Sequence, residues 1–146
     1  MGKLTLDNLR EILYDLQRRN MENKTMRVTM SELAKCLRQS YYYSKYPDTE
    51  INDKIVMGWE NHNWLQEHLS DELEKRGYKC TSEAELYYYD LKGKADLYCR
   101  SDDEKILFEF KFTSNATATN VLLPWYRRQL KYYLAALDYL GDKNVR

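Results

Sequence analysis

The chain has 146 residues, of which 43% are hydrophobic and 32% charged, with only five glycines and two prolines. This composition predicts one globular domain and excludes repeat and low-complexity proteins. Acidic and basic residues number 23 each, so bulk charge gives no sign of a nucleic-acid partner, and DNA binding would need a local basic patch.

Two absences narrow the protein class further. No apolar run is long enough to span a bilayer and no secretory signal is evident, so no membrane association and a cytoplasmic, reducing location are expected. The cysteines Cys36, Cys80 and Cys99 are widely spaced and form no Cys-x-x-Cys pair, which argues against a zinc knuckle.

Helices are predicted in the first third of the chain. Apolar residues at helical spacing predict a helix over 6–21, with Thr5 as its N-cap. Thr29 and Glu32 have the spacing of a capping box, and a second helix should continue from there to about Tyr43.

A long third helix is predicted over 51–76, with Gly77 at its C-terminal cap position. Gly58 lies in the middle of this helix, where glycine is less favourable than alanine by about 1 kcal/mol. We therefore expect a packing reason for Gly58.

The pattern then changes to short alternating runs. Antiparallel strands are predicted over 78–81, 84–90, 94–100 and 105–112, and a polar loop over 113–120. Pro124 suits the first turn of a last helix that runs to Leu140 and ends at Gly141. The predicted class is α+β, with N-terminal helices, a mainly antiparallel meander and a C-terminal helix. We expect a single domain over 1–146, with a helical part at 1–50 and the core at 51–146.

The last two predicted strands have a definite register. Ser101–Glu104 is the only turn signal between them, and centring the hairpin there pairs Leu97 with Phe108, Cys99 with Ile106 and Ala95 with Phe110 on an apolar, core-facing side. The same register places Asp96 opposite Glu109, with Lys111 on the same face. Opposed carboxylates repel each other unless a cation lies between them. A solvated, salt-bridged sheet face is the competing interpretation, and spacing alone does not separate the two.

Two helical segments carry further candidate residues. His62 follows Gly58 in the long helix, although an isolated histidine there is often only a structural residue. Gln129 and Tyr133 are four residues apart and share a helix face, which is equally compatible with a packed stripe. Around them, Arg127, Arg128 and Lys131 form a local basic patch, which is the DNA-binding candidate.

These motifs occur in the order Gly-x-x-x-His (58–62), Gly-x-x-Asp (93–96), Glu-x-Lys (109–111) and Gln-x-x-x-Tyr (129–133). Together they resemble the RecB-type branch of the PD-(D/E)XK nucleases. Ser31-Glu32-Leu33, with the following Cys36, resembles the front end of the CRISPR-associated Cas-four exonucleases. The resemblance extends over roughly 29–140 and implies a restriction-endonuclease-like, three-layer core.

The resemblance implies a role for each matching residue. His62, Asp96 and Glu109, with the backbone carbonyl of Phe110, would bind Mn²⁺ or Mg²⁺, and the imidazole favours Mn²⁺. Asp96, Glu109 and Lys111 would be catalytic, with Lys111 orienting the attacking water. Gln129 and Tyr133 would contact DNA and support the site.

The chain departs from the Cas-four family in two ways. That family holds an iron–sulfur cluster with four cysteines, but only Cys36 matches here, so a cluster is not expected and Cys36 is predicted to be a buried thiol. The family also adds a strand after the last helix, of which 144–146 is at most the beginning. An open sheet edge would favour a homo-oligomer or a partner protein that completes the sheet.

Three functions remain open at this stage. The first is a metal-dependent deoxyribonuclease, expected to be an exonuclease, that acts on single strands or DNA ends. The second is a non-catalytic module that binds DNA or protein in CRISPR adaptation or viral counter-defence. The third is a junction-resolving dimer, which the Gln-x-x-x-Tyr helix makes less favoured.

Overall fold

The computed structural model describes residues 5–22, 29–45, 53–112 and 124–146. Its elements in chain order are α1 (Leu6–Glu22), α2 (Met30–Ala34), α3 (Leu37–Lys45), α4 (Asp53–Lys75), β1 (Lys79–Tyr88), β2 (Leu91–Arg100), β3 (Lys105–Phe108) and α5 (Pro124–Tyr139). The loop predicted at 113–120 and the predicted helix start at 51–52 lie outside the described residues.

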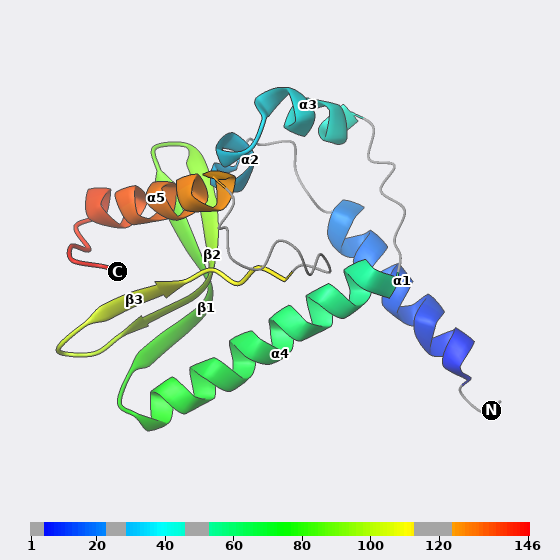
Figure 1. Cartoon of the computed structure of the whole chain (residues 1–146), viewed down its shortest axis with the longest axis horizontal. Coiled ribbons are helices and arrows are strands. Elements are labelled where there is room, and N and C mark those ends of the chain that lie inside the picture. Colours follow the sequence, from blue (N-terminus) through cyan, green and yellow to red (C-terminus); the bar gives the residue numbers. More distant parts are fainter. Residues whose placement is uncertain (1–4, 23–28, 46–52, 113–123) are drawn as a thin grey trace.

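The architecture is a mixed one of helices and a three-stranded antiparallel sheet in the order β1-β2-β3, which confirms the coarse α+β prediction. The long helix α4 packs against β1 and β2, and α5 with α2 covers the sheet from the other side (Figure 1). The core cluster contains Met30 of α2, Leu86 and Ala95 of the sheet, and Tyr133 and Leu137 of α5. None of the described helices is both long enough and apolar enough to cross a membrane.

The predicted helix starts are confirmed by their caps. Thr5 Oγ1 accepts a hydrogen bond from the Asn8 backbone N–H at 3.2 Å, at the start of α1. Thr29 and Glu32 form a complete capping box, in which the Thr29 N–H donates to the Glu32 carboxylate at 2.8 Å. Thr29 also bridges to Lys92 of β2, so the start of α2 is attached to the sheet.

The single helix predicted after Thr29 is wrong, because the chain breaks into α2 and α3. Lys35 is extended, and the Ala34 carbonyl at the end of α2 accepts a hydrogen bond from Arg128 Nε at 3.0 Å. A side chain from α5 thus satisfies a carbonyl that a continuous helix would have used internally. Cys36 lies at this break and is exposed, so the prediction of a buried thiol is also wrong.

Gly77 ends α4 as predicted. It adopts a left-handed conformation with φ of 91°, and the Tyr78 N–H reaches back to the Leu73 carbonyl at 3.1 Å. Gly58, in contrast, has no packing partner among the described residues, since a Cβ built there would meet none of their atoms within 4 Å. The expected packing reason for Gly58 is therefore not found.

The open space at Gly58 leads to a prediction. Gly58→Ala should raise the free energy of unfolding by about 0.5 to 1 kcal/mol, because alanine restricts the unfolded chain and fits the helix without contact. Urea denaturation of the variant and wild type measures this difference. A destabilised variant would show that Gly58 has a neighbour at this position.

The strands follow the predicted register but differ in extent. Leu97 pairs with Phe108 and Cys99 with Ile106, as predicted. The strands predicted over 78–81 and 84–90 form one strand, β1, which ends at Tyr88. Within it, Glu83 has a positive φ of 49°, which interrupts the extended backbone. The strand predicted at 105–112 ends at Phe108.

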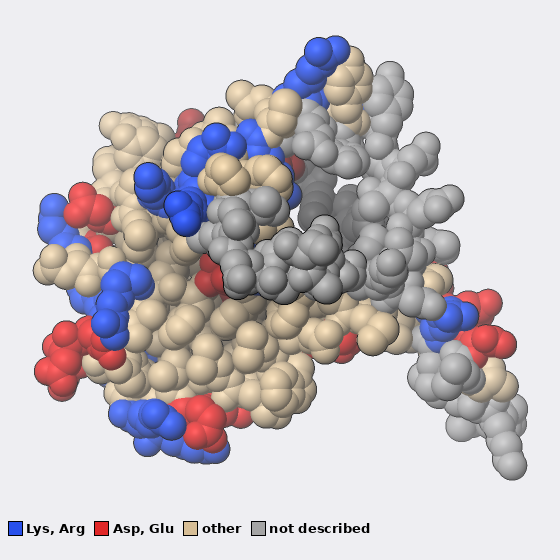
Figure 2. All heavy atoms as spheres, viewed as in Figure 1, with Lys and Arg blue, Asp and Glu red and all other residues tan. Residues whose placement is uncertain are grey.

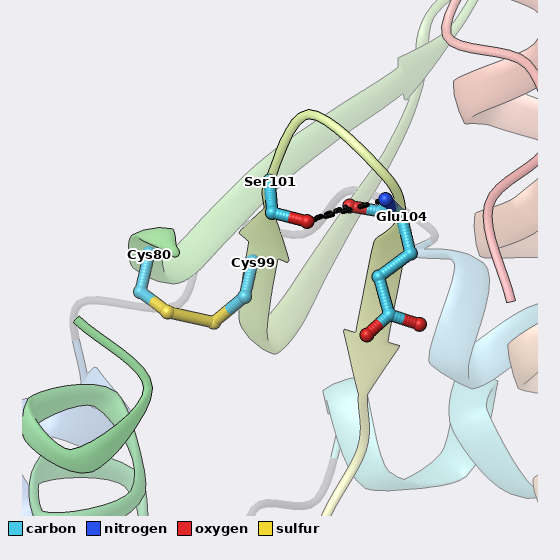
Figure 3. The surroundings of a disulfide bond; sticks show 4 residues. All are labelled: Cys80, Cys99, Ser101 and Glu104. Carbon is cyan, nitrogen blue, oxygen red and sulfur yellow. Dashed lines mark hydrogen bonds between the residues drawn. A yellow bond between two sulfur atoms is a disulfide. The ribbon is translucent and has the colours of Figure 1, made fainter. Parts of the chain in front are cut away.

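The β2–β3 turn is closed by its own side chain. Ser101 Oγ accepts from the Glu104 N–H at 3.2 Å (Figure 3). The Ser101 N–H also donates to the Glu104 carbonyl at 2.8 Å. Beside this turn, Cys80 and Cys99 are directly opposite each other on β1 and β2 and form a disulfide. Because disulfides are typical of oxidising compartments, this pairing gives no support to the expected reducing location.

The C-terminal segment lies beside β3. Val145 bridges in parallel to Lys105, and the Leu107 N–H donates to the Arg146 carbonyl at 2.8 Å. Residues 144–146 therefore form an isolated bridge rather than a further strand, and they cover part of the β3 edge that was expected to be open. Before this segment, Gly141 ends the last helix with φ of 88°, as predicted.

Asp142 attaches this segment to the sheet. Its carboxylate accepts from Lys105 Nζ at 2.5 Å and from the Tyr98 hydroxyl. Burial acts to raise the pKa of Asp142, but the hydrogen bonds from Lys105 and Tyr98 outweigh it and leave the pKa below its ordinary value.

A carboxyl with a depressed pKa stabilises the fold above its unfolded pKa, and this stabilisation is lost as the pH falls through the folded pKa. Asp142→Asn should therefore lower the stability of the fold at about pH 7. It should also make the loss of stability below about pH 4 smaller than in wild type. Thermal unfolding across this range provides the measurement. Asp138→Asn is the control, because Asp138 pairs with Lys143 on the surface at 3.3 Å. Equal pH profiles for Asp142→Asn and wild type would contradict the prediction.

Candidate active site

Asp96 of β2 and the segment just after β3 meet where the strand ladder stops. The last pair is Leu97–Phe108, and in the same register the next would be Asp96 and Glu109. Instead of continuing the ladder, the Phe110 N–H donates to Asp96 Oδ2 at 2.6 Å. The side chain of Asp96 thus takes over a backbone donor and holds the 109–111 segment beside β2.

Glu109 is the most buried of the acidic residues in this group, and its side chain is only 5% exposed. Its Oε1 accepts from Lys111 Nζ at 2.5 Å and from Gln129 Nε2 at 2.6 Å. Its Oε2 is buried and has no hydrogen-bond partner among the described residues. Burial and, next, the charge of Asp96 raise the pKa of Glu109, while Lys111 opposes this rise.

His62 comes to the site from α4. Its Nε2 lies 2.9 Å from Asp96 Oδ1, so Asp96 is held between an imidazole and a backbone N–H. The ring also meets Phe110 edge-on, with 5.9 Å between ring centroids. The structure thus brings His62, which is 34 residues away from Asp96 in sequence, into the same site.

Lys111 is the partly accessible member of the group, with 32% of its side chain exposed. Its ammonium lies over the ring of Tyr126 at 5.2 Å from the centroid, in addition to its contact with Glu109. Tyr126 is not among the site residues predicted from the sequence. The available signal was its spacing of three and seven residues from Gln129 and Tyr133, which places all three on one face of α5.

Gln129 and Tyr133 lie behind Glu109, and both side chains are covered, at 4% and 2% exposure. Gln129 Nε2 contacts the Tyr133 hydroxyl at 2.8 Å as well as Glu109. Burial and the Glu109 charge raise the pKa of Tyr133 to about 12, so its hydroxyl stays protonated. Both side chains are therefore buried next to Glu109, and their predicted roles in supporting the site and contacting DNA stay predictions.

Gly93 explains how Tyr133 reaches the sheet. A Cβ at this position would lie 2.8 Å from Tyr133 Cε1 and 2.6 Å from Met30 Sδ. The glycine of the Gly-x-x-Asp motif therefore has a structural purpose, because only a hydrogen there leaves room for the tyrosine ring.

The predicted basic patch divides into two parts. Arg128 is used to cap α2, as its Nε donates to the Ala34 carbonyl. Arg127 and Lys131 are exposed on α5. In the space-filling view, lysine and arginine side chains gather over α5 and α2 (Figure 2). The local patch thus exists on a chain of zero net charge.

The site offers ligand atoms that suit a divalent cation. It combines two carboxylates and an imidazole, and the buried Glu109 Oε2 has no hydrogen-bond partner among the described residues, although Lys111 pairs with Oε1 of the same carboxylate. In the described arrangement the side chains are bonded to protein groups, and among the described residues no three His, Cys, Asp or Glu residues are placed together to hold a metal ion. The donor types therefore fit Mn²⁺ or Mg²⁺. In the described conformation, however, Asp96 and Glu109 are hydrogen-bonded to other protein groups and are not arranged around a common metal position.

No protein-family model matches the chain, and comparisons with curated protein sequences and with solved structures find no match.

Proposed function

We propose that the chain is a divalent-metal-dependent deoxyribonuclease with a RecB-type PD-(D/E)XK site on a restriction-endonuclease-like core. The observation that carries the proposal is one connected cluster, in which His62, Asp96, Glu109, Lys111 and Gln129 join through contacts of 2.5 to 2.9 Å and the Phe110 N–H. These groups come from α4, β2, the end of β3 and α5. A salt-bridged surface face does not require a buried, unpaired carboxylate oxygen at its centre.

Asp96, Glu109 and His62 would hold the Mn²⁺ or Mg²⁺ ion, with the Phe110 carbonyl as a further oxygen ligand. When bound, such an ion acidifies water and neutralises charge on phosphate oxygens. Gln129 acts as a positioning residue, because its amide donates to Glu109 Oε1 and leaves Oε2 without a hydrogen-bond partner among the described residues.

Lys111 is the proposed catalytic cation. Its ammonium is already beside Glu109 and partly exposed, so a small rotation would bring it to a phosphate or to the attacking water. Placed there, it would orient the water and stabilise the negative charge that develops on the phosphate. The ring of Tyr126 contacts the Lys111 ammonium through a cation–π interaction.

The proposed substrate is single-stranded DNA or a DNA end, consistent with an exonuclease. Arg127 and Lys131 are exposed on the outer side of the helix that supports Glu109, where they would contact phosphates of a DNA strand that crosses α5. Their contribution would be independent of sequence and sensitive to salt.

Cleavage of labelled single-stranded and duplex DNA in Mn²⁺ tests this function. We expect Asp96→Asn and Lys111→Ala each to reduce the rate by about a hundredfold or more. Lys94→Ala is the matched control, since Lys94 also pairs with a glutamate, Glu83, at 2.9 Å, but on the outer surface. Equal rates in wild type, Asp96→Asn and Lys111→Ala would refute a nuclease role for this site.

A non-catalytic DNA- or protein-binding module is the second candidate. The observation in its favour is that Asp96 and Glu109 already have protein partners, and no three-residue metal group is found among the described residues. DNA binding without cleavage in Mg²⁺, Mn²⁺ or other divalent ions would favour it.

A further inference from the structure

An exposed group of three tyrosines lies far along β1 and α5 from the site. Tyr88 and Tyr89 at the β1–β2 turn contact Tyr139 at the end of α5, with ring centroids 4.9 and 5.2 Å apart, and each other at 5.0 Å. We call these three residues the tyrosine cluster. Their exposed fractions are 43%, 72% and 51%, so the rings present broad aromatic surface to solvent.

The turn itself is unfavourable for a tyrosine. Tyr88 pairs with Leu91, so Tyr89 and Asp90 are the two central residues of a tight hairpin turn. Such turns prefer asparagine or glycine because their first central residue has a positive φ. Tyr89 has φ of 50°, a conformation that is uncommon for a bulky side chain. A large ring held at an exposed tip despite this disadvantage indicates that the ring itself is used.

Exposed basic side chains lie on α5, the helix that carries both Gln129 of the site and Tyr139 of the tyrosine cluster. Lys131 lies two residues after Gln129 and eight before Tyr139, about 12 Å along the helix axis. Arg127 lies one turn earlier, and both are exposed. The nearby Asp138 is neutralised by Lys143 at 3.3 Å. Arg127 and Lys131 therefore place two positive charges, with no ion pair among the described residues, on the outer side of α5 before the tyrosine cluster.

We propose that the tyrosine cluster is a base-stacking platform for single-stranded DNA whose phosphates pass along Arg127 and Lys131 to the Glu109 site. This inference rests on the proposed nuclease function and extends it to a strand-holding surface. Stacking needs free base faces, which a single strand offers and a duplex does not. The flanking positive charge selects a polyanion over an uncharged peptide or sugar.

Binding is tested without cleavage, using Asp96→Asn protein in EDTA and fluorescence anisotropy of labelled oligothymidylate of about 16 nucleotides. Added to this background, Tyr89→Ala and Tyr139→Ala should each weaken binding by about tenfold, whereas Tyr89→Phe and Tyr139→Phe should keep it. An abasic strand of the same length should bind more weakly and be insensitive to these changes. Lys131→Ala should instead lower the slope of log K against log salt by about 0.7.

Trp64→Ala is the control, because Trp64 is a 59% exposed ring on α4 outside this path. The inference is overturned if the tyrosine-to-alanine variants bind like the background protein, if they weaken the abasic strand equally, or if the cluster instead mediates self-association that is lost in the same variants. Cleavage by wild type is scored separately. Base-dependent binding through the tyrosine cluster in a chain that never cleaves would refute the nuclease and keep the platform.

Discussion

Replacement of Glu109 by glutamine is expected to stabilise the fold and, at the same time, to reduce cleavage by at least about a hundredfold. Glu109 has a buried carboxylate whose Oε2 is unpaired and whose pKa is raised by burial and by Asp96. A carboxyl with a raised folded pKa contributes most to stability below its unfolded pKa, and that contribution is lost as the pH rises through the folded pKa. At neutral pH the free energy of unfolding of the wild type is therefore lowered by the cost of ionising buried Glu109, a cost that the neutral glutamine amide does not have.

Calorimetry at about pH 7 and about pH 4 measures the stability effect. The Tm of Glu109→Gln should exceed that of wild type by a few degrees at neutral pH, and the gain should shrink in acid, where wild-type Glu109 is protonated. Glu83→Gln, an exposed glutamate that also pairs with a lysine, should change neither Tm nor cleavage. A Glu109→Gln protein that is less stable than wild type at both pH values would show that the contacts of the Glu109 carboxylate outweigh the free-energy cost of burying its charge.

Mn²⁺ gives a second measurement on the same variant. A ligand that binds only the folded state stabilises it by about 2.7 kcal/mol at a hundredfold excess over Kd. The Tm of wild type should therefore rise on adding Mn²⁺ and fall back in EDTA, and the Tm of Glu109→Gln should respond little. An equal response in both proteins would place the metal elsewhere or exclude specific binding.

The second large effect is expected at Gly93. Gly93→Ala should lower the free energy of unfolding by about 1 to 3 kcal/mol, because the new methyl group would overlap Tyr133 and Met30 in the closed core. Displacing Tyr133 would also move Gln129, whose amide holds Glu109, so cleavage should fall more than the loss of folded protein explains.

Urea denaturation and cleavage rates per folded molecule separate the two effects at Gly93. Gly58→Ala is the matched control, since the same change in open space should stabilise the protein. If both glycine variants shift stability in the same direction, the close approach at Gly93 does not determine the effect.

The features that could be predicted from sequence depend on short-range interactions. The capping box at Thr29, the end of α4 at Gly77 and the end of α5 at Gly141 each involve residues within one helical turn. The β2–β3 register is also short-range, because the Ser101–Glu104 turn joins the strands and alternation then decides which residues oppose each other. That register predicted that Asp96 and Glu109 lie close together.

The errors occur where distant segments meet. Nothing near Ala34 predicts the break between α2 and α3, where Arg128 of α5 takes the carbonyl at the end of α2. The same contact leaves Arg128 less free for DNA than Arg127 and Lys131. β3 ends before its alternating pattern does, because the Asp96 side chain takes the Phe110 N–H out of the ladder.

The sequence by itself predicted the element types, the β2–β3 register and the common face of Asp96, Glu109 and Lys111, because periodicity and turn chemistry act between near neighbours. His62 entered the candidate set only through the resemblance of the ordered motifs to a known family. Only the tertiary structure decided that Gln129 and Tyr133 are buried supports of Glu109, and that Cys80 and Cys99 are paired. Burial and pairing depend on how α5 and α4 close on the sheet, and these contacts join residues that no local pattern connects.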